Sequence, residues 1–261
     1  MFFIKKTFYL LLSVFLIFDF TISAYSEQTV LNESTAIISN NPIHYEETES
    51  VVFADNKAYF KFNDPDVATT IIKNRWSKDI NYTFTEKSII YSYTYDQSSV
   101  INGSLEHVNG NIDLLPEHIR EEVLSLDLSI NRLQIPWDII TYRYVYEDFL
   151  LYSLVSKEQL DQFYKNKRFD PQILDIISYG TKVNKYGFMS TTVLKNGAMS
   201  HRPIELKIRL SRGNHGAYIA PYSAFPYEQE LLLPRNSQLI VDGSHLENNN
   251  QRLVLDALYV I

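Results

Sequence analysis

The apolar residues of this chain change their spacing near its middle, and this change restricts the possible folds more than any other feature. Before about residue 131 they recur at helical intervals, as in Ile119, Val123 and Leu126. From Ile139 onward, short β-branched and aromatic runs are separated by turn residues. Helices followed by strands predict an α+β fold with a largely antiparallel, β-rich core.

Helix starts are marked by proline and by capping residues. Thr83 and Glu86 have the spacing of a capping box, in which two side chains satisfy free amides at the start of a helix. Pro116 suits a first helical turn because its fixed φ angle is close to helical. Helices are therefore predicted over residues 64–78, 83–93, 100–105, 116–130 and 156–163.

Strands are predicted where apolar and polar residues alternate or where β-branched residues cluster. Over residues 203–210, the isoleucines and leucines should face the core, whereas Glu205, Lys207 and Arg209 should face outward. Residues 139–146, 187–193, 239–241 and 253–260, with the segment that carries Glu228 and Glu230, bring the total to at least six strands.

The N-terminus has the pattern of a secretory signal peptide. Lys5 and Lys6 precede a mostly apolar run over residues 8–20, and Ala24 and Ser26 are small residues at the positions that a signal peptidase reads. The apolar run is short for a membrane span, and a buried N-terminal helix is the alternative. We expect a signal peptide over residues 1–26, a polar lead-in or linker over 27–55, and one domain over 56–261.

Composition restricts the partners and the chemistry. The formal net charge is −7, which makes an exported protein a poor candidate for binding nucleic acid or anionic membrane. The absence of cysteine excludes disulfides, thiol nucleophiles and cysteine-ligated metals. The six histidines show no metal-ligand spacing. We therefore expect a secreted protein that uses no metal and that, in its mature form, binds neither nucleic acid nor membrane.

Two glutamates precede an apolar run that is closed by a proline. If the segment is a strand, Glu228 and Glu230 share one face, about 7 Å apart, and Gln229 faces the other way. Two like charges on one face repel each other, and a site that needs two carboxylates would tolerate this repulsion. An exposed, solvated strand face is the alternative interpretation.

Three other features become informative in combination with the two glutamates. Arg143 stands in the middle of a predicted strand, where it either extends its charge to solvent or binds an anion through its planar fork. Ser190-Thr191-Thr192 either reflects β-propensity or supplies hydroxyls that orient a nearby acid. The loop that follows carries Lys195 and Arg202, which suit a diphosphate clamp or an ordinary solvated turn.

In this order, an arginine strand, a hydroxyl strand and a Glu-x-Glu strand resemble the Arg/Ser-Thr-Ser/Glu-x-Glu class of bacterial mono-ADP-ribosyltransferases. The segments 89–94, 101–105, 188–192, 202–204 and 223–225 are similar to clostridial Rho-modifying exoenzymes, and 135–137, 142–147 and 194–199 to a secreted streptococcal arginine-modifying member. The resemblance covers about residue 56 to the C-terminus. It implies the ADP-ribosyltransferase fold, with N-terminal helices packed on a mostly antiparallel, two-sheet β core.

The resemblance also implies that NAD is the co-substrate and is split at the bond between nicotinamide and ribose. Glu230 would then face the oxocarbenium-like ribose, and Ser190 would hold Glu230 in place. Arg143 and Arg202 would bind the diphosphate. Further NAD contacts implied by the resemblance come from the N-terminal helices, at Tyr93 and Asn102.

The chain departs from its apparent relatives at three positions. Tyr144 stands where many relatives have glycine, and Glu106 stands where the Rho-modifying enzymes have arginine. Those enzymes modify asparagine and carry glutamine at the position of Glu228. A glutamate there resembles the arginine-modifying members, and it could orient a guanidinium and accept its proton.

The expected function is therefore ADP-ribosylation of an arginine on a host protein, such as a cytoskeletal protein like actin, with side NAD glycohydrolase activity. The target would contact the loop Tyr222–Tyr227, with Phe225 and Tyr227 as anchors, and the enzyme would be a secreted monomer that acts in the host cell. The alternatives are an NAD glycohydrolase without a protein target, a retaining glycosidase with two carboxylates, and a non-enzymatic secreted binding protein.

Overall fold

The computed structural model describes residues 49–54, 57–76 and 80–261, with side chains from residue 54 onward in these ranges. The predicted signal peptide and most of the predicted lead-in lie outside the described residues. The first described strand, β1 (Glu49–Ala54), falls within the range predicted as a lead-in and pairs antiparallel with β2 (Lys57–Phe62).

The helices lie mainly in the first half of the chain, as predicted. Thr83 and Glu86 form the expected capping box at the start of α3, and Ser156 and Gln159 form another at α6. Within the described residues, the helices are α2 (Pro65–Arg75), α3 (Phe84–Ser92), α4 (Ser98–His107), α5 (Glu117–Asn131), α6 (Lys157–Phe163) and α7 (Ile173–Ile176). A short π-helix, Tyr93–Gln97, joins α3 to α4.

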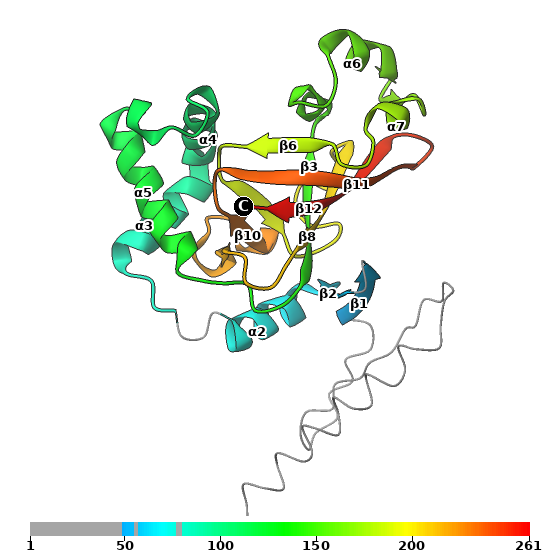
Figure 1. The fold of residues 1–261 in the computed structure, drawn as a ribbon. Helices are drawn as coiled ribbons and strands as arrows, with labels where there is room; N and C mark the ends of the chain where they lie inside the picture. The colour runs from blue at the N-terminus through cyan, green and yellow to red at the C-terminus, as the bar shows by residue number, and fades with distance from the viewer. Residues whose placement is uncertain (1–48, 55–56, 77–79) are drawn as a thin grey trace, which may run out of the picture. The chain divides into compact units, whose positions relative to one another are not determined.

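The strands form one large hydrogen-bonded sheet in the order β6-β11-β12-β8-β3-β7-β10-β9, with β2 also against β3 (Figure 1). Most pairs are antiparallel, and β8–β12 and β2–β3 are parallel. Besides β1 and β2, the strands of this sheet are β3 (Ile139–Val145), β6 (Lys182–Lys185), β7 (Met189–Thr192), β8 (Ile204–Leu210), β9 (Ala217–Tyr218), β10 (Glu230–Leu233), β11 (Ser237–Glu247) and β12 (Arg252–Val260). A separate two-stranded ribbon pairs β4 (Tyr164–Lys165) with β5 (Arg168–Phe169).

This arrangement confirms the α+β fold with a mostly antiparallel core. The two sheets expected from the resemblance appear as two portions of one ladder, because β3 and β7 are joined through a single residue pair, Tyr142 with Thr192. Three of the candidate site residues, Arg143, Ser190 and Glu230, lie at this junction, on β3, β7 and β10.

The helices cover the sheet through two apolar clusters. Ile119, Val123 and Leu126 of α5 are buried as their spacing predicts, and they share a cluster with Phe188 and Leu232 beside β7 and β10. Figure 1 shows α3, α4 and α5 grouped on this side. A larger cluster joins β8, β11 and β12 to α2, α6 and α7. Among the described residues, no helix is both long enough and apolar enough to cross a membrane.

The predicted outward face of β8 is wrong for two of its three charged residues. Glu205 is 1% exposed and Arg209 is 7% exposed. Both faces of β8 are covered. On the second face, Tyr144 of β3 lies opposite Glu205, and the Arg209 guanidinium lies over the ring of Tyr59 from β2. Each buried charge is paired: Glu205 with Arg252 at 3.2 Å, and Arg209 with Asp242. Simple alternation could not anticipate these pairs, because the partners lie far from β8 in the sequence.

Candidate active site

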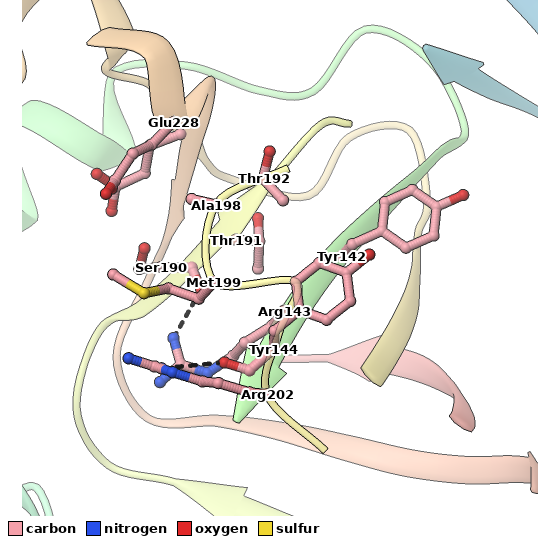
Figure 2. Close-up of a pocket in the computed structure, with 11 residues that line it drawn as sticks. Tyr142, Arg143, Tyr144, Ser190, Thr191, Thr192, Ala198, Met199, Arg202 and Glu228 are labelled. Carbon is pink, nitrogen blue, oxygen red and sulfur yellow. Dashed lines mark hydrogen bonds between the residues drawn. The ribbon is translucent and has the colours of Figure 1, made fainter. Parts of the chain in front are cut away.

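A pocket lies where β3, β7 and β10 run side by side (Figure 2). Arg143 of β3, Ser190 of β7 and Glu230 of β10 line it, together with Glu228 and with Arg202 from the loop after β7. These are the residues to which the sequence analysis assigned catalytic roles or diphosphate binding. Figure 2 shows Arg143 and Arg202 together at one end of the pocket and Glu228 at the other, with Ser190 between them.

Ser190 connects the two charged groups on its neighbouring strands. Its register partner on β10 is Leu232, so Glu230, two residues before Leu232, is its diagonal neighbour on the same face. The Ser190 hydroxyl donates to the Glu230 carboxylate. The Ser190 carbonyl oxygen accepts a hydrogen bond from Arg143 Nη1 at 2.6 Å. One residue thus positions both the acid and the guanidinium.

The two glutamates reach one pocket, but they do not share a strand face. Glu228 ends a short 3₁₀ turn, Pro226–Glu228, and Gln229 adopts a left-handed conformation with φ of 50° before β10 begins at Glu230. The prediction that the two glutamates share one strand face was therefore wrong, because Glu228 lies in the turn before β10. As predicted, Gln229 points elsewhere, because its Oε1 accepts from Tyr218 Oη at 2.5 Å and from Thr69 Oγ1 at 3.0 Å.

Burial raises the pKa of both acids. Glu230 is 4% exposed, and burial raises its pKa from 4.5 to about 7, while the Ser190 hydrogen bond opposes this rise. Glu228 adds to the increase and Arg143 reduces it. Burial also raises the pKa of the partly buried Glu228, against the effect of Arg202. Burial lowers the pKa of the Arg143 guanidinium.

Arg202 is held in place by the end of β3. Its Nη1 donates to the Tyr144 carbonyl at 3.1 Å, and its guanidinium carbon lies 4.8 Å from the centre of the Tyr146 ring. Its buried Nε has no hydrogen-bond partner within the described part of the chain. Lys195, the other cation suggested for a clamp, is exposed and does not line the pocket.

Tyr93 and Asn102 lie behind the pocket rather than in its lining. Asn102 Nδ2 donates to Tyr93 Oη at 3.0 Å, and Asn102 Oδ1 accepts from the Phe188 amide at 2.9 Å. Burial raises the pKa of the Tyr93 hydroxyl, and the charge of Glu230 raises it further. Together they brace the start of β7 from the helical side. A direct contact of either residue with NAD stays a prediction.

Sequence reasoning missed the residues that cover the pocket. Ala198 and Met199 line it from the loop, and Met199 has a positive φ of 63° that no local pattern in the sequence indicates. Gly197 allows the close approach of this loop to β7, since an added Cβ would lie 2.7 Å from Thr192 Oγ1. Within the described residues, no three His, Asp or Glu side chains are grouped so that they could bind a metal ion.

Comparison with known proteins identifies the fold and the family. The chain is 30% identical to the epidermal cell differentiation inhibitor of Staphylococcus aureus over 258 residues, which cover 95% of this chain and 97% of that protein. It is 31% identical to a mono-ADP-ribosyltransferase C3 of Hathewaya limosa over 179 residues, covering 67% of this chain and 69% of that protein. Among solved structures, C3stau2 from S. aureus with NAD matches with a TM-score of 0.70 and 31% identity, covering 77% of this chain and 97% of that chain.

The C3 exoenzyme of Clostridium limosum matches with a TM-score of 0.71 and 26% identity, covering 78% of this chain and 98% of that chain. The sequence pattern of the family described as ADP-ribosyltransferase exoenzyme matches residues 69–261, which include every residue of the pocket. The chain therefore belongs to the ADP-ribosyltransferase exoenzyme family.

Proposed function

We propose that this enzyme transfers ADP-ribose from NAD to an arginine side chain of a host protein, and that the reaction takes place in the pocket between β3, β7 and β10. The observation that carries the proposal is the pair of acids in this pocket, one buried beside Ser190 and Arg143 and the other only partly buried. Two carboxylates in different surroundings suit two different tasks.

The guanidinium groups of Arg143 and Arg202 would bind the diphosphate of NAD. Both line the pocket, and the charge of Arg202 lowers the pKa of Arg143, so a bound anion would relieve the repulsion between the two cations. The buried Nε of Arg202, unpaired among the described residues, is a free donor for a phosphate oxygen. This arrangement orients the nicotinamide ribose toward Glu230.

Glu230 would stabilise the positive charge that the ribose acquires as nicotinamide leaves. Its carboxylate is buried, so its interaction with that charge is weakly screened by water. Ser190 fixes the carboxylate through a hydrogen bond and favours its ionised form. Because the pKa of Glu230 is about 7, a large fraction of the enzyme carries the needed charge at and above neutral pH.

Glu228 would act on the incoming arginine. A guanidinium is a poor nucleophile because it is protonated and has no free lone pair. A carboxylate that pairs with it can orient one nitrogen and accept its proton as the new bond forms. The turn Pro226–Glu228 and the left-handed Gln229 place Glu228 outside β10 at the pocket's edge, where a protein side chain can reach it.

The loop Tyr222–Tyr227 would contact the protein acceptor. The Ala224 amide donates to Thr94 Oγ1 at 2.9 Å, and the Tyr222 ring lies edge-on to Tyr82 with 5.2 Å between centres. These contacts anchor the loop to the helices, while Tyr227 remains 73% exposed. A fixed loop with an exposed aromatic tip suits recognition of another protein. The predicted signal peptide supports export of the enzyme from the bacterium.

Agmatine, a small guanidine compound, tests the acceptor chemistry without a protein target. With labelled NAD, the wild-type enzyme should form ADP-ribosyl-agmatine and should also hydrolyse some NAD. Glu228→Gln should lose transfer to agmatine and keep appreciable hydrolysis, whereas Glu230→Gln should lose both by about 10²–10³-fold. Hydrolysis without any transfer by the wild type would indicate an NAD glycohydrolase instead. Equal loss of hydrolysis in both variants would contradict the separate roles of the two acids.

A further inference from the structure

We propose that Tyr144, together with Arg252 and Glu205, positions the loop of residues 195–202 over the NAD pocket and so sets the affinity for NAD. We call residues 195–202 the covering loop. The inference rests on the proposed assignment of this pocket to NAD, and it adds a positioning role for three residues outside the predicted catalytic set.

The covering loop has a defined but costly conformation. Turns within it join the Ser200 amide to the Gly197 carbonyl at 3.3 Å and the Arg202 amide to the Met199 carbonyl at 3.0 Å. Asn196 and Met199 have positive φ angles of 60° and 63°. Residues other than glycine adopt this region at a cost in energy, and they stay there when surrounding contacts hold them. The loop therefore depends on contacts from outside it.

Tyr144 supplies such contacts at both ends of the loop. Its hydroxyl oxygen accepts a hydrogen bond from the Asn196 amide at 3.0 Å, and its carbonyl oxygen accepts one from Arg202 Nη1 at 3.1 Å. Tyr144 itself is 3% exposed in the sheet. One rigid residue thus fixes the start of the loop and the guanidinium that closes it. A glycine at this position could not provide the hydroxyl contact.

Arg252 holds the middle of the loop. Its Nη2 donates to the Ser200 carbonyl oxygen, and its Nη1 donates to Glu205 at 3.2 Å. Its guanidinium carbon also lies 5.5 Å from the centre of the Tyr144 ring. Arg252 therefore joins the loop to the ring and to a buried acid at the same time.

The strand register explains why these three residues meet. Tyr144 of β3 is opposite Glu205 of β8, and Glu205 is opposite Val254 of β12. Arg252, two residues before Val254, is the diagonal neighbour of Glu205 on the same face. Three adjacent strands thus carry the three residues that hold the covering loop.

The consequence for NAD follows from what the loop contributes. Ala198, Met199 and Arg202 line the pocket, whereas Glu228 and Glu230 belong to the β10 segment. Loosening the loop would displace Arg202, Ala198 and Met199 without moving the two glutamates. The Michaelis constant for NAD should therefore change more than kcat.

Tyr144→Phe tests this role because it keeps the ring and removes the hydroxyl. Limited trypsin digestion gives a direct readout, since Lys195 is exposed and the scissile bond contains the Asn196 amide that the hydroxyl holds. Loss of one hydrogen bond should speed cleavage after Lys195 by about 3- to 10-fold and raise KM for NAD to a similar degree, with kcat changed less. Tyr164→Phe in the β4–β5 ribbon is the matched control and should change neither.

A second variant keeps the proposal testable if the first is too mild. Arg252→Lys retains a charge beside Glu205 and loses the planar fork, so it should also speed cleavage after Lys195 and raise KM for NAD. In the double variant with Tyr144→Phe, each effect should be smaller than the sum expected for two independent changes. Unchanged cleavage after Lys195 in both variants would contradict the proposal that Tyr144 and Arg252 position the covering loop. Faster cleavage with unchanged KM for NAD would overturn its role in NAD binding. Arg143→Lys tests the underlying assignment separately, because unchanged NAD affinity in that folded variant would exclude Arg143 from the NAD site whatever the loop does.

Discussion

Replacing Glu230 by glutamine should stabilise the enzyme at alkaline pH relative to acid pH. In the folded state the carboxyl of Glu230 is 4% exposed, and burial raises its pKa from 4.5 to about 7. The folded protein therefore binds this proton more tightly than the unfolded chain does. The stability that the protonated carboxyl contributes is fully present below about pH 4.5 and is lost as the pH rises through about 7.

The magnitude follows from the two pKa values. The change from 4.5 to about 7, at about 1.4 kcal/mol for each pH unit, gives about 3 kcal/mol at most. Between pH 5 and pH 8, about 2–3 kcal/mol of this should be lost in the wild type. Glutamine has nearly the same shape and does not titrate. The difference in free energy of unfolding between Glu230→Gln and wild type should therefore shift by this amount in favour of the variant.

Urea denaturation at several pH values, followed by circular dichroism, measures this difference directly. Taking the difference between two proteins cancels the titration of all other groups that they share. Glu121→Gln is the matched control, because it removes the same charge from an exposed position on α5 and should give a difference that varies little with pH. A pH-independent difference for Glu230→Gln would refute the argument that burial holds Glu230 partly protonated.

Three further predictions concern the pocket. Arg143→Lys keeps the charge and loses the fork that donates to Ser190, so isothermal titration calorimetry should show NAD affinity reduced by about 10-fold or more; unchanged affinity in a folded variant would exclude Arg143 from the site. Ser190→Ala removes the hydrogen bond that lowers the pKa of Glu230. The pH at which kcat/KM for NAD reaches half its maximum should therefore rise, and turnover should fall without vanishing. An ADP-ribosyl adduct trapped on Ser190 in the wild type would contradict this positioning role. Tyr227→Ser removes an aromatic side chain that is 73% exposed, so KM for a protein acceptor should rise several-fold while transfer to agmatine is unchanged; an equal loss with both acceptors would argue against a docking role.

The features that sequence patterns predicted well are local ones. The capping box at Thr83 was predicted correctly because it needs only two residues three positions apart. The buried face of α5 followed from helical periodicity. The site residues Arg143, Ser190 and Glu230 were identified from a resemblance in their order along the chain, and the structure brings them into one pocket.

The features that were missed depend on contacts between distant segments. Glu205 was expected to face solvent, and it is buried because Arg252, 47 residues later, reaches it. The left-handed conformation of Gln229 has no signature in the sequence, because glutamine rarely adopts it without support. That support comes from the hydroxyls of Thr69 and Tyr218, which hold the Gln229 side chain from the opposite side. Neither contact can be inferred from residue spacing.

The role proposed for Glu230 and the stability of the protein favour opposite charge states of this carboxyl. The ionised carboxylate is the form that can stabilise a positive ribose, and it is also the form that burial disfavours. As the pH rises through about 7, the enzyme should therefore gain activity toward NAD while it loses free energy of unfolding from this one group. Moving the carboxyl into water would remove the loss of stability, but it would also screen the charge on which the proposed reaction depends. The Ser190 hydrogen bond offers a partial solution, because it favours the ionised form without exposing it. We infer that the hydroxyl at Ser190 lies beside the acid for this reason, and that its place on a central strand keeps the geometry rigid.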